Sequence, residues 1–284
     1  MIDVKRSPRG RRAASPALAA ALLACGGRAP DVIYLPSAAD VVTRMLEVAR
    51  VDSADLVYDL GCGDGRIVIA AARDRRARGV CVDIDPSLVA RSRHNADTAG
   101  VADRIEFRHA DMFETDLRSA TVVALYLSPS LNVRLRPKLF REVQPGAWIV
   151  SHNFDMGDWK PDTVVRVTWP AGTTSAVQAW QLPADVAGTW EVVVSADAAA
   201  ERRFRVRFAQ HHQQLNGTAS EEGRTMTVAG ARLAGDSVEF ELSGRTGDRP
   251  DLLRLNGRVS GAEMRGAVWS AANTAGTSWR AVRR

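Results

Sequence analysis

Three glycines stand at every second position in the segment VYDLGCGDGRIVIAAA, residues 57–72. They separate a short apolar segment, which is typical of a buried strand, from an alanine-rich segment, which is typical of a helix. Glycine tolerates positive φ and lets another molecule come close to the backbone. Gly61, Gly63 and Gly65 therefore predict a tight strand-to-helix turn beside a bound ligand.

Strand-like and helix-like segments alternate around this turn, from residue 31 to about residue 182. The expected strands are DLVYDL (55–60), GVCVDID (79–85), RIEFRHAD (104–111), ATVVALYL (120–127) and AWIVSHNF (147–154), followed by a closing hairpin of TVVRVTW (163–169) and SAVQAW (175–180). The expected helices are residues 37–50, 66–77, 86–100 and 131–143. This alternation predicts an α/β domain with a mainly parallel sheet covered on both faces.

The alternation of strand-like and helix-like segments ends at Leu182-Pro183. In RFRVRF, residues 203–208, arginines alternate with apolar side chains, which is the pattern of a strand with one wet face. Similar short segments, separated by Gly, Asp and Asn, continue to the end of the chain. Residues 183–284 therefore predict a second domain, a small antiparallel β-barrel or sandwich of unknown role.

The N-terminal segment, residues 1–30, has the composition of a targeting sequence. Five basic residues precede AASPALAAALLAC, an uncharged segment that is too short to span a bilayer comfortably. LLAC resembles the lipobox of bacterial lipoproteins, so we expect a signal or a lipid anchor at Cys25; a disordered extension is the alternative. These basic residues account for most of the formal net charge of +5. The near-neutral remainder predicts no nucleic-acid partner.

Cysteine and histidine give no case for a metal or a disulfide. The spacing of Cys25, Cys62 and Cys81 fits neither a zinc pattern nor a disulfide framework, so we expect Cys62 to be a small packed residue. His211 and His212 are adjacent in a strand-like segment, where successive side chains point to opposite faces. We therefore predict no metal site there.

Acidic residues lie at or near the ends of three of the predicted strands. Asp83, followed by Ile84, ends the second strand and could accept hydrogen bonds from both hydroxyls of a ribose. Asp111 ends the third and could accept from an adenine amine, with Met112 packed on the ring. Asp59 ends the first and could orient the turn or meet a cationic amino group. Together these positions predict a nucleoside pocket.

The ligand of this pocket is better matched by S-adenosylmethionine (SAM) than by a dinucleotide. A dinucleotide pyrophosphate favours Gly-x-Gly-x-x-Gly, whereas this chain has Gly-x-Gly-x-Gly. Asp59 and Asp64 would also repel a diphosphate, while a cationic sulfonium needs no phosphate cradle. The spacing is similar to that of class I SAM-dependent methyltransferases.

Three further segments narrow this resemblance. YLPS, DLGCGDGRIVIAAA and GAWIVSHNFDMGDWKPD together resemble the mitochondrial lysine methyltransferases that modify the c-subunit of ATP synthase and the adenine nucleotide translocase, and their bacterial relatives. The resemblance covers residues 31–182 and not residues 183–284. It implies a Rossmann-like seven-stranded sheet, SAM as cofactor and a protein lysine as acceptor. Members of the family also tend to carry an N-terminal hydrophobic membrane segment, which fits residues 13–25.

Methyl transfer from a sulfonium is an in-line displacement that mainly requires alignment and exclusion of water. We therefore expect no catalytic triad and no catalytic residue in the strict sense. Tyr34 is the candidate to close over SAM; its alternative role is a hydrophobic staple before a helix capped by Ser37. Tyr126, Ser128 and Pro129 are candidates for the acceptor channel. The segment LYLSPS that contains them differs from the Asp/Asn-Pro-Pro-Tyr of enzymes that methylate base amines.

The roles of His152, Asn153 and Asp155, at the end of the fifth predicted strand, stay open from the sequence. Two alternatives to a protein-lysine methyltransferase also stay open: a small-molecule methyltransferase on the same fold, and a non-catalytic, exported or lipid-anchored binding protein. Because SAM is a cytosolic metabolite, an active enzyme implies a cytoplasmic catalytic domain, with a membrane-associated protein among its possible substrates.

Overall fold

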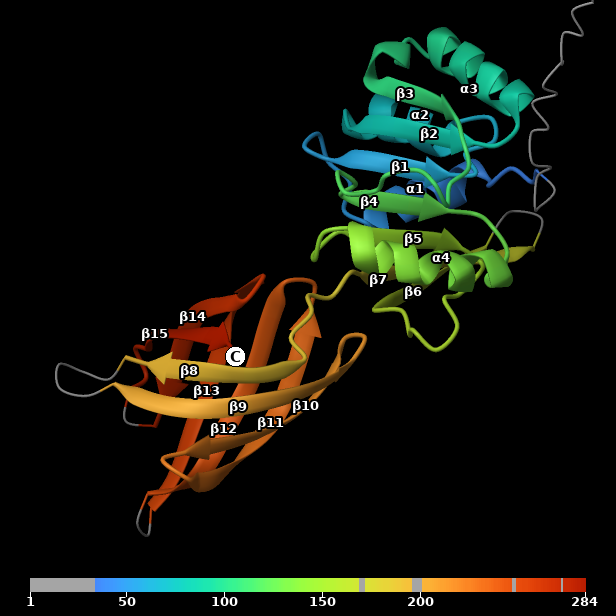
Figure 1. Cartoon of the computed structure of the whole chain (residues 1–284). Coiled ribbons are helices and arrows are strands. Elements are labelled where there is room, and N and C mark those ends of the chain that lie inside the picture. Colours follow the sequence, from blue (N-terminus) through green and yellow to red (C-terminus); the bar gives the residue numbers. More distant parts are fainter. Residues whose placement is uncertain (1–33, 169–171, 196–200, 247–248, 272) are drawn as a thin grey trace, which may run out of the picture.

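The computed structural model describes residues 34–168, 172–195, 201–246, 249–271 and 273–284 (Figure 1). The expected signal segment and Cys25 lie outside these residues. Two bodies follow one another along the chain, a layered α/β domain and a β-barrel (Figure 1). Among the described residues, no helix has the length and apolar composition needed to cross a membrane.

The first body is built on a seven-stranded sheet with the order β3-β2-β1-β4-β5-β7-β6. Strands β1 to β5 are parallel, and β7 and β6 close one edge in antiparallel fashion, as the hairpin prediction anticipated. The strands are β1 Leu56–Leu60, β2 Arg78–Asp83, β3 Ile105–His109, β4 Val122–Leu125, β5 Trp148–His152, β6 Thr163–Thr168 and β7 Thr174–Gln181. The Rossmann-like fold class expected from the resemblance is confirmed.

Helices cover both faces of this sheet because alternate strand residues point to opposite sides. On one face, Val57 of β1 packs in a cluster with Val41 and Met45 of α1. On the other face, Leu60 of β1 packs in a cluster with Leu135 of α4. The helices are α1 Ala39–Val48, α2 Arg66–Arg75, α3 Pro86–Thr98, the short 3₁₀ helix η1 Ala102–Arg104, and α4 Pro129–Glu142.

The second body is a closed eight-stranded antiparallel barrel in which each strand pairs with its neighbours in sequence and β15 pairs with β8. This decides between the barrel and the sandwich. Apolar side chains such as Trp190, Phe204 and Phe240 are buried in its interior, while Arg203 and Arg205 are exposed. The strands are β8 Gly188–Val194, β9 Arg202–His211, β10 Gln214–Glu221, β11 Arg224–Ala234, β12 Ser237–Thr246, β13 Arg249–Ser260, β14 Glu263–Ser270 and β15 Thr277–Arg283.

A short connection joins the two bodies. Strand β7 ends at Gln181 and β8 begins at Gly188, and we propose that the domains divide between them, at residues 182–183. The backbone N–H of Ala184 donates to the carbonyl of Gly235 at 2.8 Å, which fixes this connection to the β11–β12 turn of the barrel. The barrel contacts the sheet domain through Gln213, whose side chain bonds to Trp159 and Lys160 in the loop before β6.

Candidate active site

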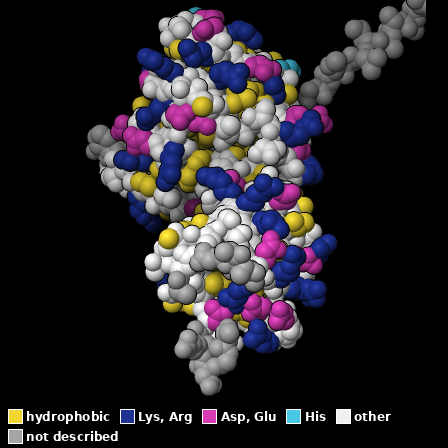
Figure 2. All heavy atoms as spheres, turned by 90° about the vertical axis from the view of Figure 1, so that its left-hand side faces the viewer, with side chains coloured by type: hydrophobic (Ala, Val, Ile, Leu, Met, Phe, Trp, Pro, Cys, Tyr) yellow, Lys and Arg dark blue, Asp and Glu magenta, His cyan; other side chains and the backbone are white. Residues whose placement is uncertain are grey.

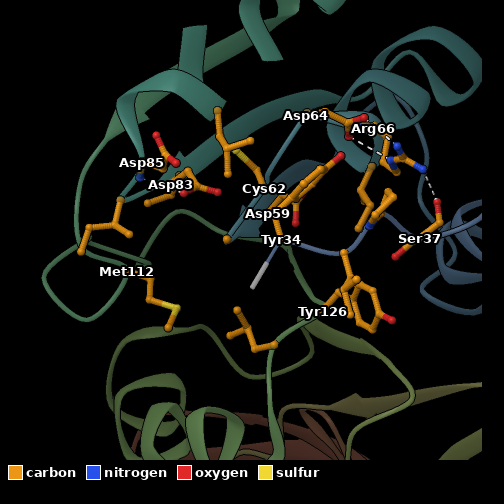
Figure 3. Close-up of a pocket in the computed structure, with 18 of the residues that line it drawn as sticks. Tyr34, Ser37, Asp59, Cys62, Asp64, Arg66, Asp83, Asp85, Met112 and Tyr126 are labelled. Atoms are coloured by element: carbon orange, nitrogen blue, oxygen red, sulfur yellow. Dashed lines mark hydrogen bonds and ion pairs between the residues drawn. The ribbon is translucent and has the colours of Figure 1, made fainter. Parts of the chain in front are cut away.

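A pocket opens at the carboxyl ends of the central parallel strands (Figure 3). It lies near the point between β1 and β4 at which the order of strands in the sheet changes direction. This is where open α/β sheets bind ligands. Most of the sequence-predicted residues line it together: Tyr34, Asp59, Gly61, Asp83, Ile84, Asp111, Met112 and Tyr126. Gly63, Gly65, Ser128 and Pro129 do not line it. The three expected strand ends therefore do converge on one cavity.

The glycine turn has the backbone conformation that requires glycine. Gly61, Gly63 and Gly65 have φ values of +77°, +57° and +79°. The space above Gly63 is occupied by Tyr34: a Cβ on Gly63 would lie 2.3 Å from Cε2 of that ring. A Cβ on Gly65 would lie 2.8 Å from Cβ of Ser92 in α3. Two of the glycines thus serve the packing of the turn, and only Gly61 faces the cavity.

Asp83 connects the end of β2 to this turn. Its Oδ2 accepts from the Gly63 N–H at 2.8 Å and its Oδ1 accepts from the Asp85 N–H at 3.0 Å. The side chain is buried, with 7% of the residue exposed. A carboxylate has about four acceptor positions, so each oxygen keeps capacity for a ligand hydroxyl. Two backbone bonds fix the orientation of the group before any ligand binds.

Asp59 is the most deeply buried acid of the pocket, with 2% exposed. Its Oδ2 is buried without a hydrogen-bond partner among the described residues. Burial, and secondarily the charges of Asp83 and Asp64, raise the pKa of Asp59 to about 8. An unpartnered buried acceptor is rare in native proteins. Its position in this pocket fits a cationic or hydrogen-bonding group of a ligand.

This pKa predicts a specific dependence of stability on pH. The pKa of Asp59 is raised from 3.8 to about 8, so its contribution to stability is full below pH 3.8, falls progressively as pH rises from there, and is lost once pH has passed about 8. Asp59→Asn mimics the protonated group at every pH. In urea unfolding between pH 5 and 8.5, the wild type should lose stability relative to this variant. The exposed-site control Asp97→Asn should show no such divergence, and parallel profiles for Asp59→Asn and wild type would refute the assignment.

Asp64 and Arg66 form a bidentate pair at the rim of the pocket. Nε and Nη2 of Arg66 donate to the two carboxylate oxygens at 2.9 and 2.6 Å, and Nη1 donates to the carbonyl of Ser37 at 2.5 Å. Burial acts to raise the pKa of Asp64, but the bonds from Arg66 outweigh it and the pKa is lowered. Arg66 therefore offsets part of the negative charge by which Asp64 was expected to repel a diphosphate. Arg66 was missed because an arginine at a helix start is typical of a solvated face.

Asp111 and Met112 approach the cavity from the loop after β3. Oδ1 of Asp111 accepts from the Phe113 N–H at 2.8 Å, which fixes the carboxylate within a tight turn. Met112 lines the cavity next to it, and Figure 3 shows its side chain across the cavity from Asp59. This pair lies where the sequence placed an adenine contact, with a carboxylate and an apolar thioether at the same end of the pocket.

Tyr126 lines the opposite end of the pocket and is held by His152. The two rings stack with centroids 3.9 Å apart and an interplanar angle of 26°. The His152 nitrogens lie 2.9 Å from Oγ of Ser37 and 3.0 Å from Oγ of Ser175. Burial lowers the pKa of His152 to about 4, so the ring is neutral near pH 7. His152 is thus a buried support for Tyr126.

The bond from Ser37 to His152 removes one expectation. Helix α1 begins at Ala39 after Ala38, with no side-chain cap, so Ser37 is not the N-cap residue. The alternative role of Tyr34 as a staple before a capped helix therefore loses its basis. Asn153 and Asp155 bond to backbone N–H groups of Ala176 and Gly157, at 2.7 and 3.0 Å, and hold the loop after β5.

Ser128 and Pro129 begin helix α4. Oγ of Ser128 accepts from the Leu131 N–H at 3.4 Å, and Pro129 is the first helical residue. Ser followed by Pro is the common chemistry of a helix start. Their place in the sequence is explained by this cap, and of the three acceptor-channel candidates the structure brings only Tyr126 to the pocket.

Cys62 and Cys81 form a disulfide, which the spacing argument did not anticipate. The turn after β1 folds back onto β2, where the N–H groups of Gly61 and Cys62 both donate to the Val82 carbonyl, at 2.8 and 3.1 Å. Parallel strands separated by a helix thereby bring the two sulfurs together across 19 residues of sequence. The bond ties the glycine turn to β2 at the wall of the pocket.

Comparison with known proteins agrees with this geometry. The model of the ANTKMT methyltransferase domain matches residues 59–163. A protein-lysine N-methyltransferase from Saccharolobus islandicus is 42% identical over 139 residues, which cover 49% of this chain and 86% of that protein. The chain belongs to this family of SAM-dependent methyltransferases. The match spans the sequence-predicted strand ends Asp59, Asp83 and Asp111.

Two further relatives are matched over a smaller share of their own length. The adenine nucleotide translocase lysine N-methyltransferase of Mus musculus is 33% identical over 48% of this chain and 58% of that protein. The lysine N-methyltransferase that is named for the c-subunit of ATP synthase in Homo sapiens is 30% identical over 46% and 55%. The chain thus spans little more than half of these two proteins.

A solved structure described as an RNA methyltransferase from Salinibacter ruber with S-adenosyl-L-homocysteine is 53% identical, with a TM-score of 0.51. It covers 54% of this chain and 96% of that one. S-adenosyl-L-homocysteine is what remains of SAM after methyl transfer, so its presence in that structure agrees with SAM as the cofactor of the present methyltransferase.

Proposed function

We propose that this methyltransferase transfers the methyl group of SAM to the ε-amine of a lysine in a protein. The observation that supports this most is the charge of the pocket. Its lining contains one arginine, Arg66, which pairs with Asp64, and four further acids: Asp59, which is mostly protonated near pH 7, and Asp83, Asp85 and Asp111. Such a pocket favours cationic groups over anionic ones. Both the sulfonium cofactor and an approaching lysine are cationic, and relatives in the family are named as lysine methyltransferases.

The strand ends hold the cofactor in this proposal. Asp83 accepts from the ribose hydroxyls, and Asp111 accepts from the exocyclic amine of adenine with Met112 against the ring. Asp59, with its unpartnered buried oxygen, would hold the amino group of the cofactor as a hydrogen-bond acceptor. Gly61 provides the backbone at the cavity wall. When bound, SAM supplies a methyl group on a positively charged sulfur.

The protein's task toward the acceptor is to present a neutral amine and exclude water. Burial lowers the pKa of a lysine and so favours the nucleophilic form. Tyr126, fixed by its stacking on His152, forms an aromatic wall at the end of the pocket away from Met112. Tyr34, seated on the glycine turn, closes a second side. This arrangement needs no triad or metal ion for the transfer itself.

RNA is the second candidate acceptor, because the relative from Salinibacter ruber bears that name. Two observations favour lysine. The segment after β4 reads LYLSPS and lacks the motif of base-amine methylation. On the face shown in Figure 2, basic and acidic side chains are interspersed over both domains, without a continuous basic surface. A small-molecule acceptor remains an alternative because acceptor identity depends on loops.

A membrane-associated substrate belongs to the same proposal. The basic and apolar character of residues 1–25 is its support, and these residues lie outside the described part of the chain. An N-terminal anchor would keep the catalytic domain at the cytoplasmic membrane surface and raise the effective concentration of substrates there.

Incubation of the full chain and a cell lysate with SAM labelled in its methyl group tests the acceptor. We expect the label to resist nuclease, to become soluble with protease, and to co-elute with methylated lysine after acid hydrolysis. Asp83→Ala should abolish most of this signal. Label that is released by nuclease, or that appears only in small molecules, would contradict the lysine proposal and leave the SAM site unaffected.

A further inference from the structure

Three potential metal ligands meet where the barrel contacts the sheet domain. Asp158 lies in the loop between β5 and β6, His211 is the last residue of β9, and His212 follows it in the β9–β10 turn. One ligand atom from each of the three side chains lies within 4.8 Å of the others. Asp158 therefore comes from one domain and both histidines from the other.

The premise of the argument against a metal from adjacent histidines does not hold at this position. It assumed a continuous strand, in which neighbouring side chains point to opposite faces. His212 instead has φ of +53°, in the left-handed region, where the strand ends and the turn begins. The turn rotates the second side chain, and the two imidazole rings lie 4.3 Å apart.

We propose that Asp158, His211 and His212 bind a zinc ion that links the barrel to the methyltransferase domain. Nε2 of His211 lies 3.3 Å from Oδ2 of Asp158. Two ligands bound to zinc at about 2.0–2.1 Å in a tetrahedron are about 3.3 Å apart, so this pair already has the required separation. Two histidines and one carboxylate are a known zinc donor set, with water in the fourth position.

The neighbouring residues hold the ligands in place. Nη1 of Arg136 donates to Oδ1 of Asp158 and, at 2.7 Å, to the carbonyl of Met156. This leaves Oδ2 directed to His211. Carboxylate ligands in metal sites are commonly oriented by such outer hydrogen bonds. The positive charge of Arg136 also opposes a cation nearby, so we expect weaker binding than in closed four-ligand sites.

The other histidine is fixed by aromatic packing. The His212 ring lies 5.9 Å from the Trp159 ring and 5.6 Å from the Phe140 ring, measured between centroids. Gln213 accepts from Nε1 of Trp159 at 2.9 Å and donates to the Lys160 carbonyl at 2.7 Å. The hairpin is thus already attached to the loop that carries Asp158, so the three side chains lie near one another before an ion binds.

The experiment is a zinc titration of the chelator-treated full chain by calorimetry, repeated with Co²⁺ to follow its visible absorption. We expect one ion per chain at this site. His211→Ala should weaken that binding at least about 100-fold, because loss of a direct ligand should exceed the roughly 10- to 100-fold cost of losing an outer hydrogen-bond partner. Cobalt should give the absorption of a site with nitrogen and oxygen ligands, without a thiolate band.

The matched control is His94→Ala, an exposed histidine on α3, which should bind as the wild type does. Folding is not expected to confound the result, since the side chains of His211 and Asp158 are 66% and 61% exposed. Asp158→Asn provides a second variant with the same predicted loss. Absence of zinc binding by the wild type would show an ordinary ion pair instead. Binding that survives in both variants would place the ion elsewhere, and either result would overturn the proposal.

Discussion

Gly63→Val is expected to abolish measurable SAM binding, a loss of more than about 100-fold, while the chain remains folded. Gly63 has φ of +57°, and a Cβ there would lie 2.3 and 2.7 Å from two atoms of the Tyr34 ring. A residue other than glycine in this region costs about 1–3 kcal/mol in strain alone. The turn must move, and the bond from the Gly63 N–H to Asp83 then breaks.

Calorimetry with SAM measures the effect, with circular dichroism to confirm folding. Gly100→Val is the matched control, because Gly100 has a similar φ of +70° and no atom within 4 Å of a Cβ built there. It should lose stability from the same kind of strain but keep its SAM affinity. A folded Gly63→Val protein that binds SAM normally would show that the turn and Tyr34 do not form the site.

Asp83→Ala is expected to weaken SAM binding by about 1.5–3 kcal/mol, the scale for losing hydrogen bonds to a charged acceptor. This corresponds to a factor of roughly 10 to 150 in Kd. The carboxylate has two tasks that alanine cannot perform. It holds the Gly63 and Asp85 N–H groups at 2.8 and 3.0 Å, and in our proposal it accepts from the ribose hydroxyls.

Asp83→Asn separates these tasks in part, because it keeps one acceptor oxygen. It should bind SAM with an affinity between those of the wild type and Asp83→Ala. Asp97→Ala, at an exposed position on α3, controls for loss of an acidic charge. Equal affinities of wild type and folded Asp83→Ala would remove the ribose assignment.

Much of the fold and cofactor pocket could be predicted because both depend on local patterns. Alternating strands and helices specify a parallel sheet, and residues that end parallel strands must meet at one edge. Asp59, Asp83 and Asp111 were found in this way and share one cavity. The strands of the barrel could likewise be predicted from the alternation of apolar and polar residues. The closure of the barrel could not, because closure depends on the pairing of β15 with β8.

The features that the sequence did not reveal are contacts between segments far apart in the chain. His152 supports Tyr126 only because Ser37 and Ser175 reach it from two other elements. The disulfide of Cys62 and Cys81 depends on how the turn folds back on β2. Ser128 and Pro129 show that a local pattern can serve two ends, since both begin helix α4 and their role as acceptor-channel residues stays a prediction.

The most direct test of the account is a crystal structure of the full chain with S-adenosylhomocysteine. We predict adenine beside Asp111 and Met112, the ribose hydroxyls on the carboxylate of Asp83, and the amino group within hydrogen-bond distance of Oδ2 of Asp59. Tyr34 should remain seated on Gly63, with Tyr126 facing the sulfur. A ligand bound outside this pocket, or bound within it without contact to Asp83 and Asp59, would contradict the proposed site.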